Sequence, residues 1–452
     1  MGKITLQQAA AWCGGHVEEK YKDVAFKGAN IDSRKVQPGQ LFIALMGERD
    51  GHDFIPKAME NGAAAVLCSR PCGDIPAIIV EDPRLALGDI ARAERKRIGM
   101  QVVGVTGSVG KSTTKEMIAT VLASTYRVEK TPVNHNNDLG MPMAILDMAE
   151  DTQIAVLEMG MNHFREIAYL TNIAQPNVAV IINIGTTHIE FLGSKEGILQ
   201  AKMEILEGMR EGSQLFLNGD DALLCTQKDL SQVQVSLFGL ENPQCHIKAD
   251  DILEEESYMY FRVSAGDAIF PMELNLEGKH YISDALAAVS VGLAMGVEPA
   301  KIQESLSQFQ NMAGRQETFV QKGCTIIKDC YNAGPESMAA ALEVLGKKEG
   351  RHVAILGDML ELGACTQAEH YRVGRIAAEK ADLLLAYGPN SNRVLTGALT
   401  GGMSETKAMA FEDRDKIIAA LKRLVKPGDV LLVKGSRGMH MELILEGFLK
   451  ED

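Results

Sequence analysis

The sequence predicts a three-domain α/β protein. Its 452 residues are about three times the length of a typical single domain. Short apolar runs alternate with helical patterns, an order typical of parallel sheets covered by helices. This alternation starts afresh after about residue 98 and again after about residue 313. We therefore expect a small α/β domain at 1–98, a central doubly wound parallel-sheet domain at 99–313 and a further α/β domain at 314–452.

The expected elements follow from the apolar runs in chain order. In the first domain we expect strands at 40–44 and 63–67 and a charged helix that ends near residue 97. In the central domain we expect strands at 102–105, 154–157 and 178–182, with a helix at 112–124 after the first of them. In the last domain we expect strands at 325–327, 353–356, 383–386 and 430–433, and a helix through 342–345.

Composition and charge exclude several classes of protein. Hydrophobic residues make up 46% and charged residues 23%, which is ordinary for a globular chain. The net charge of −14 argues against binding nucleic acid by general attraction to phosphates. No apolar run reaches the roughly 18–20 residues that span a bilayer, and the first residues do not form a signal peptide. The eight cysteines are scattered, so we expect reduced thiols in a cytoplasmic protein, and we expect a monomer.

A glycine-rich turn between an apolar strand and a helix is the sharpest local signal. In such a turn, backbone N–H groups surround phosphate oxygens and the helix N-terminus adds partial positive charge. A lysine at its end reaches the outer phosphates and the next hydroxyl binds Mg²⁺. We expect Lys111 and Ser112 to act in these two ways. The residues expected to bind ATP here are Thr106, Gly107, Ser108, Val109, Gly110, Lys111, Ser112 and Thr113.

This turn departs from the strict phosphate-loop pattern at its first glycine, where Val105 stands. The sequence Thr-Gly-x-x-Gly-Lys-Ser-Thr instead resembles the phosphate loop of the Mur ligase superfamily. Its members are ATP-dependent, amide-forming enzymes of peptidoglycan synthesis and folate polyglutamylation. The resemblance implies a central ATPase domain between a domain that binds UDP and a Rossmann-like C-terminal domain.

Two polar residues at strand ends and one lysine fit the same resemblance. Glu158 and His188 each follow an apolar strand, where doubly wound folds bind ligands, and Lys202 lies in a helical stretch further on. Taken singly, such residues are more often structural. After a phosphate loop, their order resembles the Mur ligase pattern. That resemblance implies that Glu158 and His188 bind a second Mg²⁺ and that Lys202 is carbamylated and joins the metal ligands, with Ser112 on the first ion.

Motifs near the two ends of the chain resemble the family members that act late in muramoyl-peptide assembly. Asn30–Arg34 and the segment 38–58 resemble a UDP-binding domain, which implies that Ser33 and Arg34 contact the UDP-sugar. The stretches 329–338, 356–363 and 433–437 resemble the ligases that add D-alanyl-D-alanine to UDP-N-acetylmuramoyl-tripeptide through an acyl phosphate. The third-residue-adding ligases carry an Asp-Asn-Pro-Arg motif there, and it does not occur in this chain.

The resemblance also assigns residues of the last domain and reveals two departures. It implies that Arg315 and Asp329 bind ATP and that Asn332, Lys434, Ser436 and Arg437 bind the substrates or the phosphate. Asp284 stands where the family has an asparagine that faces adenine, so it accepts but does not donate a hydrogen bond. Gly334 stands where asparagine is usual.

Two alternatives stay open at this point. One is another amide ligase of the superfamily, of the third-residue-adding or folylpolyglutamate type. The other is a nucleotide-binding switch protein without ligase activity. Within the favoured reading, the residue pattern leaves open whether the tripeptide ends in lysine or in diaminopimelate.

Overall fold

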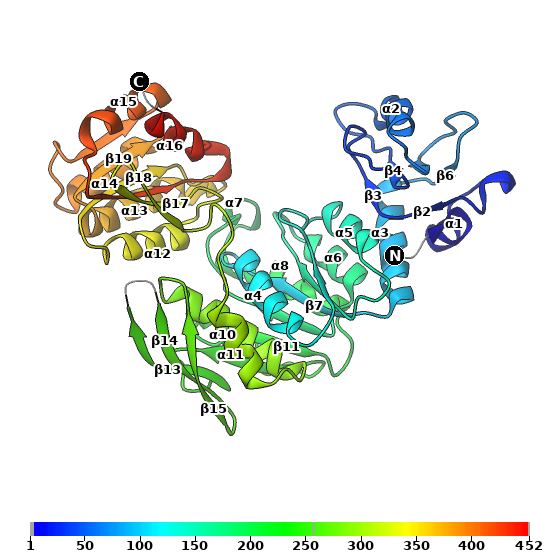
Figure 1. Ribbon diagram of the computed structural model, residues 1–452, viewed down its shortest axis with the longest axis horizontal. Helices are drawn as coiled ribbons and strands as arrows, with labels where there is room; N and C mark the ends of the chain where they lie inside the picture. Colours follow the sequence, from blue (N-terminus) through cyan, green and yellow to red (C-terminus); the bar gives the residue numbers. More distant parts are fainter. Residues whose placement is uncertain (1–3, 256–257, 451–452) are drawn as a thin grey trace.

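The computed structural model describes residues 4–255 and 258–450. Figure 1 shows the chain as three bodies in sequence order, with the first in blue, the second in cyan to green and the third in yellow to red. None of the described helices is long and apolar enough to cross a membrane.

The first body is a small α/β unit. Its elements are β1 (Ile4–Thr5), α1 (Leu6–Cys13), η1 (Glu19–Tyr21), β2 (Ala25–Phe26), β3 (Ala29–Asn30), β4 (Leu41–Ile43), η2 (Gly51–Phe54), α2 (Ile55–Glu60), β5 (Ala65–Cys68), β6 (Ala77–Ile79) and α3 (Pro83–Ile98). Strands β3, β4, β5 and β6 pair in parallel in that order, and β1 pairs with β2 antiparallel. The side chain of Asp82 caps α3 by accepting hydrogen bonds from two backbone N–H groups.

The second body is built on a large sheet. Its elements are β7 (Gln101–Thr106), α4 (Lys111–Ala123), β8 (Val128–Lys130), α5 (Gly140–Asp147), β9 (Ile154–Glu158), α6 (Glu166–Ala174), β10 (Val178–Ile181), α7 (Ile189–Leu192), α8 (Lys195–Met203), η3 (Glu204–Gly208), β11 (Gln214–Asn218), α9 (Ala222–Cys225), β12 (Gln234–Gly239), β13 (Ile247–Glu254), β14 (Met259–Ala265), β15 (Ala268–Leu274), α10 (His280–Ala294) and α11 (Pro299–Ser307). Within the described residues the strand order is β15-β14-β13-β12-β11-β10-β7-β9-β8.

This central sheet confirms the doubly wound parallel arrangement except at one edge. All pairs from β8 to β13 are parallel, whereas β14 and β15 add antiparallel strands. Strands β7, β9 and β10 are neighbours in its middle, so their carboxyl ends meet at one edge. Ligands of doubly wound folds bind at such an edge.

The third body is a second α/β unit. Its elements are β16 (Glu317–Gln321), β17 (Cys324–Asp329), α12 (Pro335–Leu345), β18 (Arg351–Gly357), η4 (Gly363–Cys365), α13 (Thr366–Lys380), β19 (Leu383–Tyr387), α14 (Ser391–Thr400), β20 (Ala408–Phe411), α15 (Arg414–Leu424), β21 (Asp429–Lys434), η5 (Arg437–Met439) and α16 (Met441–Leu449). Its strand order is β16-β17-β21-β18-β19-β20, parallel except for β16. Buried residues on both faces of this sheet give the unit its own core.

The first and second bodies share a hydrophobic core along α3. Buried Leu87, Ile90 and Ala91 belong to the same apolar cluster as residues of α1 and of α5 and α6. At Gly88 the two bodies approach closely, because a Cβ there would lie 2.2 Å from the Tyr169 hydroxyl on α6. Helix α3 therefore fixes the first body on the central one.

Candidate active site

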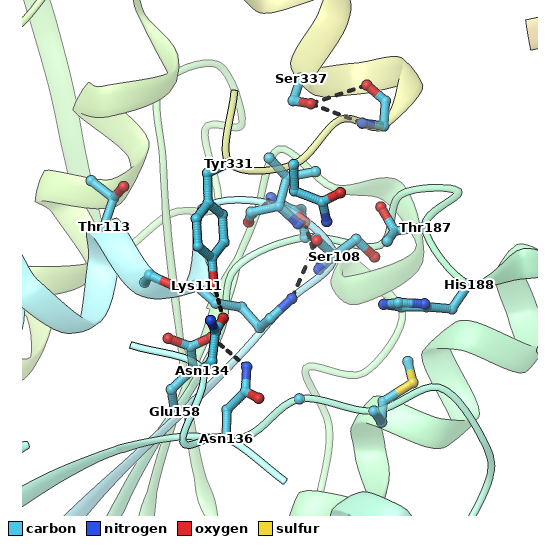
Figure 2. A pocket seen from close by; sticks show the side chains of 18 of the residues that line it. Ser108, Lys111, Thr113, Asn134, Asn136, Glu158, Thr187, His188, Tyr331 and Ser337 are labelled. Atoms are coloured by element: carbon cyan, nitrogen blue, oxygen red, sulfur yellow. Dashed lines mark hydrogen bonds between the residues drawn. The ribbon is translucent and has the colours of Figure 1, made fainter. Parts of the chain in front are cut away.

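A cavity of about 850 Å³ lies beside the carboxyl ends of β7, β9 and β10. The phosphate loop, the segment 134–138 and residues after β9 and β10 line it from the central domain. Tyr331 to Ala333 and the start of α12 line it from the last domain, and Arg84 and Leu85 of α3 reach it from the first. Figure 2 shows side chains from the central and last domains facing each other across this space.

Hydrogen bonds from the loop after β10 hold the phosphate loop. The backbone N–H groups of Ser108 and Val109 donate to Asn183 Oδ1 over 3.0 and 2.9 Å, and Asn183 Nδ2 donates to the Val109 carbonyl. The Gly185 N–H donates to Ser108 Oγ over 2.9 Å. Gly110 has a φ of +87°, which favours glycine, and precedes α4 without a side-chain cap. The first N–H groups of α4 are therefore available to an anion.

Lys111 lies across the mouth of this loop. Its Nζ donates to the Gly107 carbonyl over 2.9 Å and is 3.4 Å from that of Ser108. In Figure 2 its amine lies between Glu158 and His188. Removal from water lowers the Lys111 pKa, an effect that the charge of Glu158 opposes. The amine thus lies at the phosphate loop, and its contact with the outer phosphates stays a prediction.

Glu158 lies at the end of β9 with a nearly buried side chain. Its Oε1 accepts a hydrogen bond from Asn136 Nδ2 over 2.8 Å, and its backbone N–H donates to Thr131 Oγ1 over 3.0 Å. These contacts fix the carboxylate at the edge of the cavity. Sequence reasoning missed Asn136. The run of polar residues at 134–138, before α5, is the signal that could have indicated it.

His188 and Lys202 lie close to the charge of Lys111. His188 has a φ of +65°, and burial lowers its pKa to about 3, with Lys111 and Lys202 adding to the effect. Burial also lowers the pKa of Lys202 well below its usual value, as does Lys111. Within residues 4–255 and 258–450, the Lys202 amine has no hydrogen-bond or ion-pair partner, and it does not line the cavity. The Lys202 amine is thus buried and has no partner in the described part of the chain.

Contacts from the last domain reach the phosphate loop. Arg315 Nη2 donates to Ser112 Oγ over 2.9 Å, and its guanidinium lies 4.1 Å from the centroid of the Tyr331 ring. The Tyr331 hydroxyl donates to Asn134 Oδ1, a contact visible in Figure 2. The structure thus brings Arg315 to the loop, where the resemblance places it.

Two carboxylates of the last domain contact the loop after β10, and sequence reasoning missed both. Glu336 at the start of α12 accepts hydrogen bonds from the Thr186 N–H over 3.1 Å and from its hydroxyl over 3.2 Å. Glu361 Oε2 lies 2.5 Å from His188 Nδ1, although that ring nitrogen is not aligned for a hydrogen bond. Their partners lie 150 and 173 residues earlier in the chain, so no local pattern indicates either contact.

The other expected residues of the last domain are engaged with one another. Lys434 is buried and donates to Asp329 Oδ2 over 2.6 Å and to the Asn332 carbonyl over 3.0 Å. All three line the cavity. The Ser436 hydroxyl donates to the Ala333 carbonyl, so it fixes the loop before α12. Arg437 lies outside the cavity lining, with 66% of its side chain exposed.

Asp284 lies against the phosphate loop. It is buried, accepts a hydrogen bond from Thr114 Oγ1 over 2.8 Å, and would lie 2.7 Å from a Cβ at Gly110. Burial raises its pKa to about 7. It lines the cavity, and its contact with adenine stays a prediction.

Ser33 and Arg34 lie on the first body and do not line the cavity. Ser33 is buried and its carbonyl accepts a hydrogen bond from Asn61 Nδ2 over 2.7 Å. Arg34 has 81% of its side chain exposed and donates from Nε and Nη2 to Asp32 over 2.9 Å each. Their role toward UDP stays a prediction.

The donor set of the cavity fits Mg²⁺ bound together with a nucleotide. Among the residues that the structure describes, no three His, Cys, Asp or Glu side chains converge as a preformed metal site. Glu158 supplies a fixed carboxylate at the cavity edge, whereas the buried Lys202 amine does not line the cavity and has no partner in the described part of the chain. Mg²⁺ prefers to be held by one or two carboxylates together with substrate phosphates. The residues therefore suit an ion that arrives with ATP.

A phosphate loop at the edge of a parallel sheet, faced by a separate α/β domain, defines a nucleotide-using enzyme whose reactants meet between domains. Models of the Mur ligase family match three segments: the "Mur ligase family, catalytic domain" at 25–95, the "Mur ligase middle domain" at 105–292 and the "Mur ligase, glutamate ligase domain" at 314–437. The chain belongs to the Mur ligase family, which confirms the resemblance.

Individual relatives match over the full length. The UDP-N-acetylmuramoyl-tripeptide--D-alanyl-D-alanine ligase of Bacillus subtilis (strain 168) is 37% identical, covering 100% of this chain and 99% of its own. The Escherichia coli (strain K12) ligase of the same name is 34% identical, with 98% coverage of both. Crystal structure I of MurF from Acinetobacter baumannii has a TM-score of 0.93 at 32% identity and covers both chains completely. MurF from Thermotoga maritima, solved with ADP, has a TM-score of 0.83 at 31% identity, covering 94% of this chain and 97% of its own.

Proposed function

We propose that this enzyme joins D-alanyl-D-alanine to UDP-N-acetylmuramoyl-tripeptide, converting ATP to ADP and phosphate, in the synthesis of the peptidoglycan precursor. The observation that carries this proposal is full-length similarity to ligases of that name together with the cavity shared by all three domains. The reaction takes place in the cytoplasm and the enzyme acts as a monomer. Residues 1–98 bind UDP, residues 99–313 bind ATP, and residues 314–452 close the site.

The phosphate loop holds the ATP phosphates. The N-terminal N–H groups of α4 and the amine of Lys111 face the anion, and Arg315 adds a second cation from the last domain. Preorganised donors of this kind stabilise charge that develops on a transferring phosphoryl group. The relative solved with ADP supports nucleotide binding in this fold. Asp284 and Asp329 border the same cavity and complete the proposed ATP contacts.

Two Mg²⁺ ions complete the site in this proposal. Ser112 would hold one ion, and Glu158 and His188 the other, with Lys202 carrying a carbamate. Mg²⁺ supplies Lewis-acid charge stabilisation when bound. The buried position of the Lys202 amine, which has no partner among the described residues, supports the carbamate, because addition of CO₂ would supply an anionic oxygen ligand there.

The chemistry activates a carboxylate toward an amine. A carboxylate is a poor acyl donor, because its negative charge resists attack and it offers no good leaving group. Transfer of the γ-phosphoryl group to the tripeptide's terminal carboxylate gives an acyl phosphate, and the dipeptide amine then displaces phosphate. Contacts of Glu336 with Thr186 and of Tyr331 with Asn134 hold the last domain over this centre. Such closure keeps water from the acyl phosphate.

The uridine end of the substrate binds the first body in this proposal. The arginine fork suits a diphosphate, because it donates two aligned hydrogen bonds. Ser33 and Arg34 would meet the UDP, whereas Asn332, Lys434, Ser436 and Arg437 would bind or support the peptide and the phosphate. Of these four, Ser436 acts through the loop that its hydroxyl fixes.

Phosphate release with the purified enzyme tests the proposal. We expect phosphate release with ATP, Mg²⁺, UDP-muramoyl-tripeptide and D-alanyl-D-alanine together. We expect none when either the UDP-tripeptide or the dipeptide is omitted. Release with a free amino acid in place of the dipeptide would indicate a different ligase of the family. ATP binding without release under any combination would indicate a nucleotide-dependent switch. Parallel assays with lysine- and diaminopimelate-containing tripeptides then identify the third residue.

A further inference from the structure

Lys115 is a buried cation that the proposed reaction does not use. It lies on α4 one turn after Lys111, and its side chain is completely buried. Its Nζ donates to the Thr131 carbonyl over 2.7 Å and lies 3.2 Å from Glu116 Oε1 and 3.9 Å from Glu158 Oε2. Burying a charge is costly unless the charge is paired. We therefore ask which carboxylate acts as the counter-ion of Lys115.

Of the two carboxylates beside Lys115, Glu158 is the one that has no second ion-pair partner within 4.0 Å among the described residues, although its charge also acts on Lys111. Glu116 also pairs with Lys130, and 16% of its side chain is exposed. The Glu158 side chain is only 4% exposed, and in the described part of the chain Lys115 is its one ion-pair partner within 4.0 Å. The other side-chain contact of Glu158 among the described residues is the neutral amide of Asn136.

Thr131 closes a ring of contacts between Lys115 and Glu158. Its carbonyl accepts from Lys115 Nζ, its hydroxyl accepts from the Glu158 N–H, and its own N–H donates to the Val156 carbonyl on β9. Helix α4, which begins in the phosphate loop, is therefore tied to the strand that ends in Glu158. Lys115 thus supplies both the positive charge beside Glu158 and the hydrogen bond to the Thr131 carbonyl.

We infer that Lys115 is a positioning residue that holds the Glu158 carboxylate in place as its permanent counter-ion before any metal arrives. This inference rests on the proposed function, in which Glu158 binds Mg²⁺. It has two consequences. Without Lys115, the metal-free protein carries a buried carboxylate that has lost its ion-pair partner, and it loses stability. A divalent ion that binds Glu158 no longer competes with the lysine charge, so it binds more tightly.

A double-mutant cycle in metal-free protein tests the first consequence. Urea unfolding midpoints are measured in EDTA for the wild type, Lys115→Met, Glu158→Gln and the double variant. We expect Lys115→Met to lower the midpoint and the added Glu158→Gln to recover at least half of that loss, because glutamine keeps the acceptor for Asn136 without the charge. Additive effects of the two substitutions would overturn the inference, since a lysine that only packs would not sense the charge of Glu158.

Metal binding tests the second consequence with a milder variant. Lys115→Gln keeps a donor for the Thr131 carbonyl and removes the charge, and Mn²⁺ binding in the presence of ADP is followed by electron paramagnetic resonance. We expect two- to tenfold tighter Mn²⁺ binding than in the wild type, with unchanged affinity for ADP alone. Equal or weaker Mn²⁺ binding would overturn the inference. If wild-type protein with ADP binds no Mn²⁺, the proposed metal site itself fails, whereas the metal-free cycle still judges the pairing of Lys115 with Glu158.

Discussion

The phosphate loop and the Asp32–Arg34 turn are both short motifs with a cationic side chain, yet the molecule holds them very differently. The phosphate loop is fixed by Asn183 and by the Gly185 N–H from a neighbouring strand end. The Arg34 guanidinium contacts only Asp32, two residues away, in the described structure, and it is mostly exposed. Its hydrogen bonds lower the Asp32 pKa to about 2, so that pair is charged at neutral pH.

This difference concerns preorganisation. The donors at the phosphate loop are in place before a nucleotide binds, so little of the binding energy goes into ordering them. Arg34 has to exchange its Asp32 partner for a diphosphate, and that exchange reduces the net gain from the new contact. Substitutions in the central site should therefore reduce the rate of the chemical step, whereas substitutions in the turn should alter substrate affinity.

The largest effect is expected at Lys202. Lys202→Ala removes the proposed carbamate, an oxygen ligand that a hard cation requires, so turnover should fall by more than about 10³-fold. Steady-state phosphate release measures it. A small carboxylate such as acetate or formate should restore part of the activity by filling the vacated space.

Lys202→Arg is the matched control, because it retains a cationic side chain but a guanidinium does not form the carbamate. We expect it to be as inactive as Lys202→Ala. An active Lys202→Arg enzyme would show that the position needs a positive charge rather than an anionic ligand.

Lys111→Ala should have the next largest effect. Loss of one preorganised donor at the transferring phosphoryl group lowers kcat by about 10²–10³-fold. The KM for the UDP-tripeptide should stay within about twofold of the wild-type value, because the first body is untouched. A folded variant with near-normal kcat would show that the phosphate loop does not take part in the reaction.

Arg34→Ala should have a smaller and more selective effect. We expect the KM for the UDP-tripeptide to rise about tenfold, with the KM values for ATP and the dipeptide nearly unchanged. Asp32→Asn is the informative partner variant, because it keeps the turn but weakens the pairing of residue 32 with Arg34, which competes with the diphosphate. We expect its KM for the UDP-tripeptide to fall. A rise in the KM for ATP in Arg34→Ala would show that the turn serves the nucleotide instead.

Asp284→Asn should affect turnover least and alter stability with pH. Burial raises the Asp284 pKa to about 7 in the folded protein, against an ordinary value of 3.8. Between these two values the folded protein binds the proton and the unfolded chain does not, so this carboxyl lowers stability as pH rises from about 4 to about 7. The variant should therefore exceed the wild type in free energy of unfolding by roughly 1–4 kcal/mol more at pH 8 than at pH 4. Urea unfolding at both pH values measures this difference, and a pH-independent difference would contradict the assignment.

Local patterns predict the strands and the phosphate loop well, because each depends on residues close in sequence. The expected strand at 154–157 is observed at Ile154–Glu158 and the expected helix at 112–124 is observed at Lys111–Ala123. Strands β11, β12 and β13 and the antiparallel strands β14 and β15 were not predicted from the sequence, although alternating apolar and polar residues are typical of antiparallel strands with one solvated face. Placement of Glu158 at the end of β9 and of His188 in the connection between β10 and α7 also follows from the chain order of a doubly wound sheet.

Contacts between distant segments could not be predicted from one sequence. Asn183 follows its strand as an unremarkable polar residue, and only the paired strands β7 and β10 show that its side chain reaches the phosphate loop. Glu336 contacts Thr186, which lies 150 residues earlier, through the packing of two domains. Lys434 pairs with Asp329 because its strand lies next to β17, a contact that one sequence does not reveal, and its binding of substrate stays a prediction.

Helix α3 has a consequence for where the chain can be divided. Its buried side chains belong to one apolar cluster with those of the first body and with α5 and α6. A fragment that ends at residue 98 would expose the apolar face of α3 to water. The remainder of the chain would expose the faces of α5 and α6 that pack against α3. The last body has separate cores on both faces of its sheet. Heat should therefore melt residues 4–313 as one cooperative unit and the C-terminal body as another, so calorimetry should resolve two transitions rather than three.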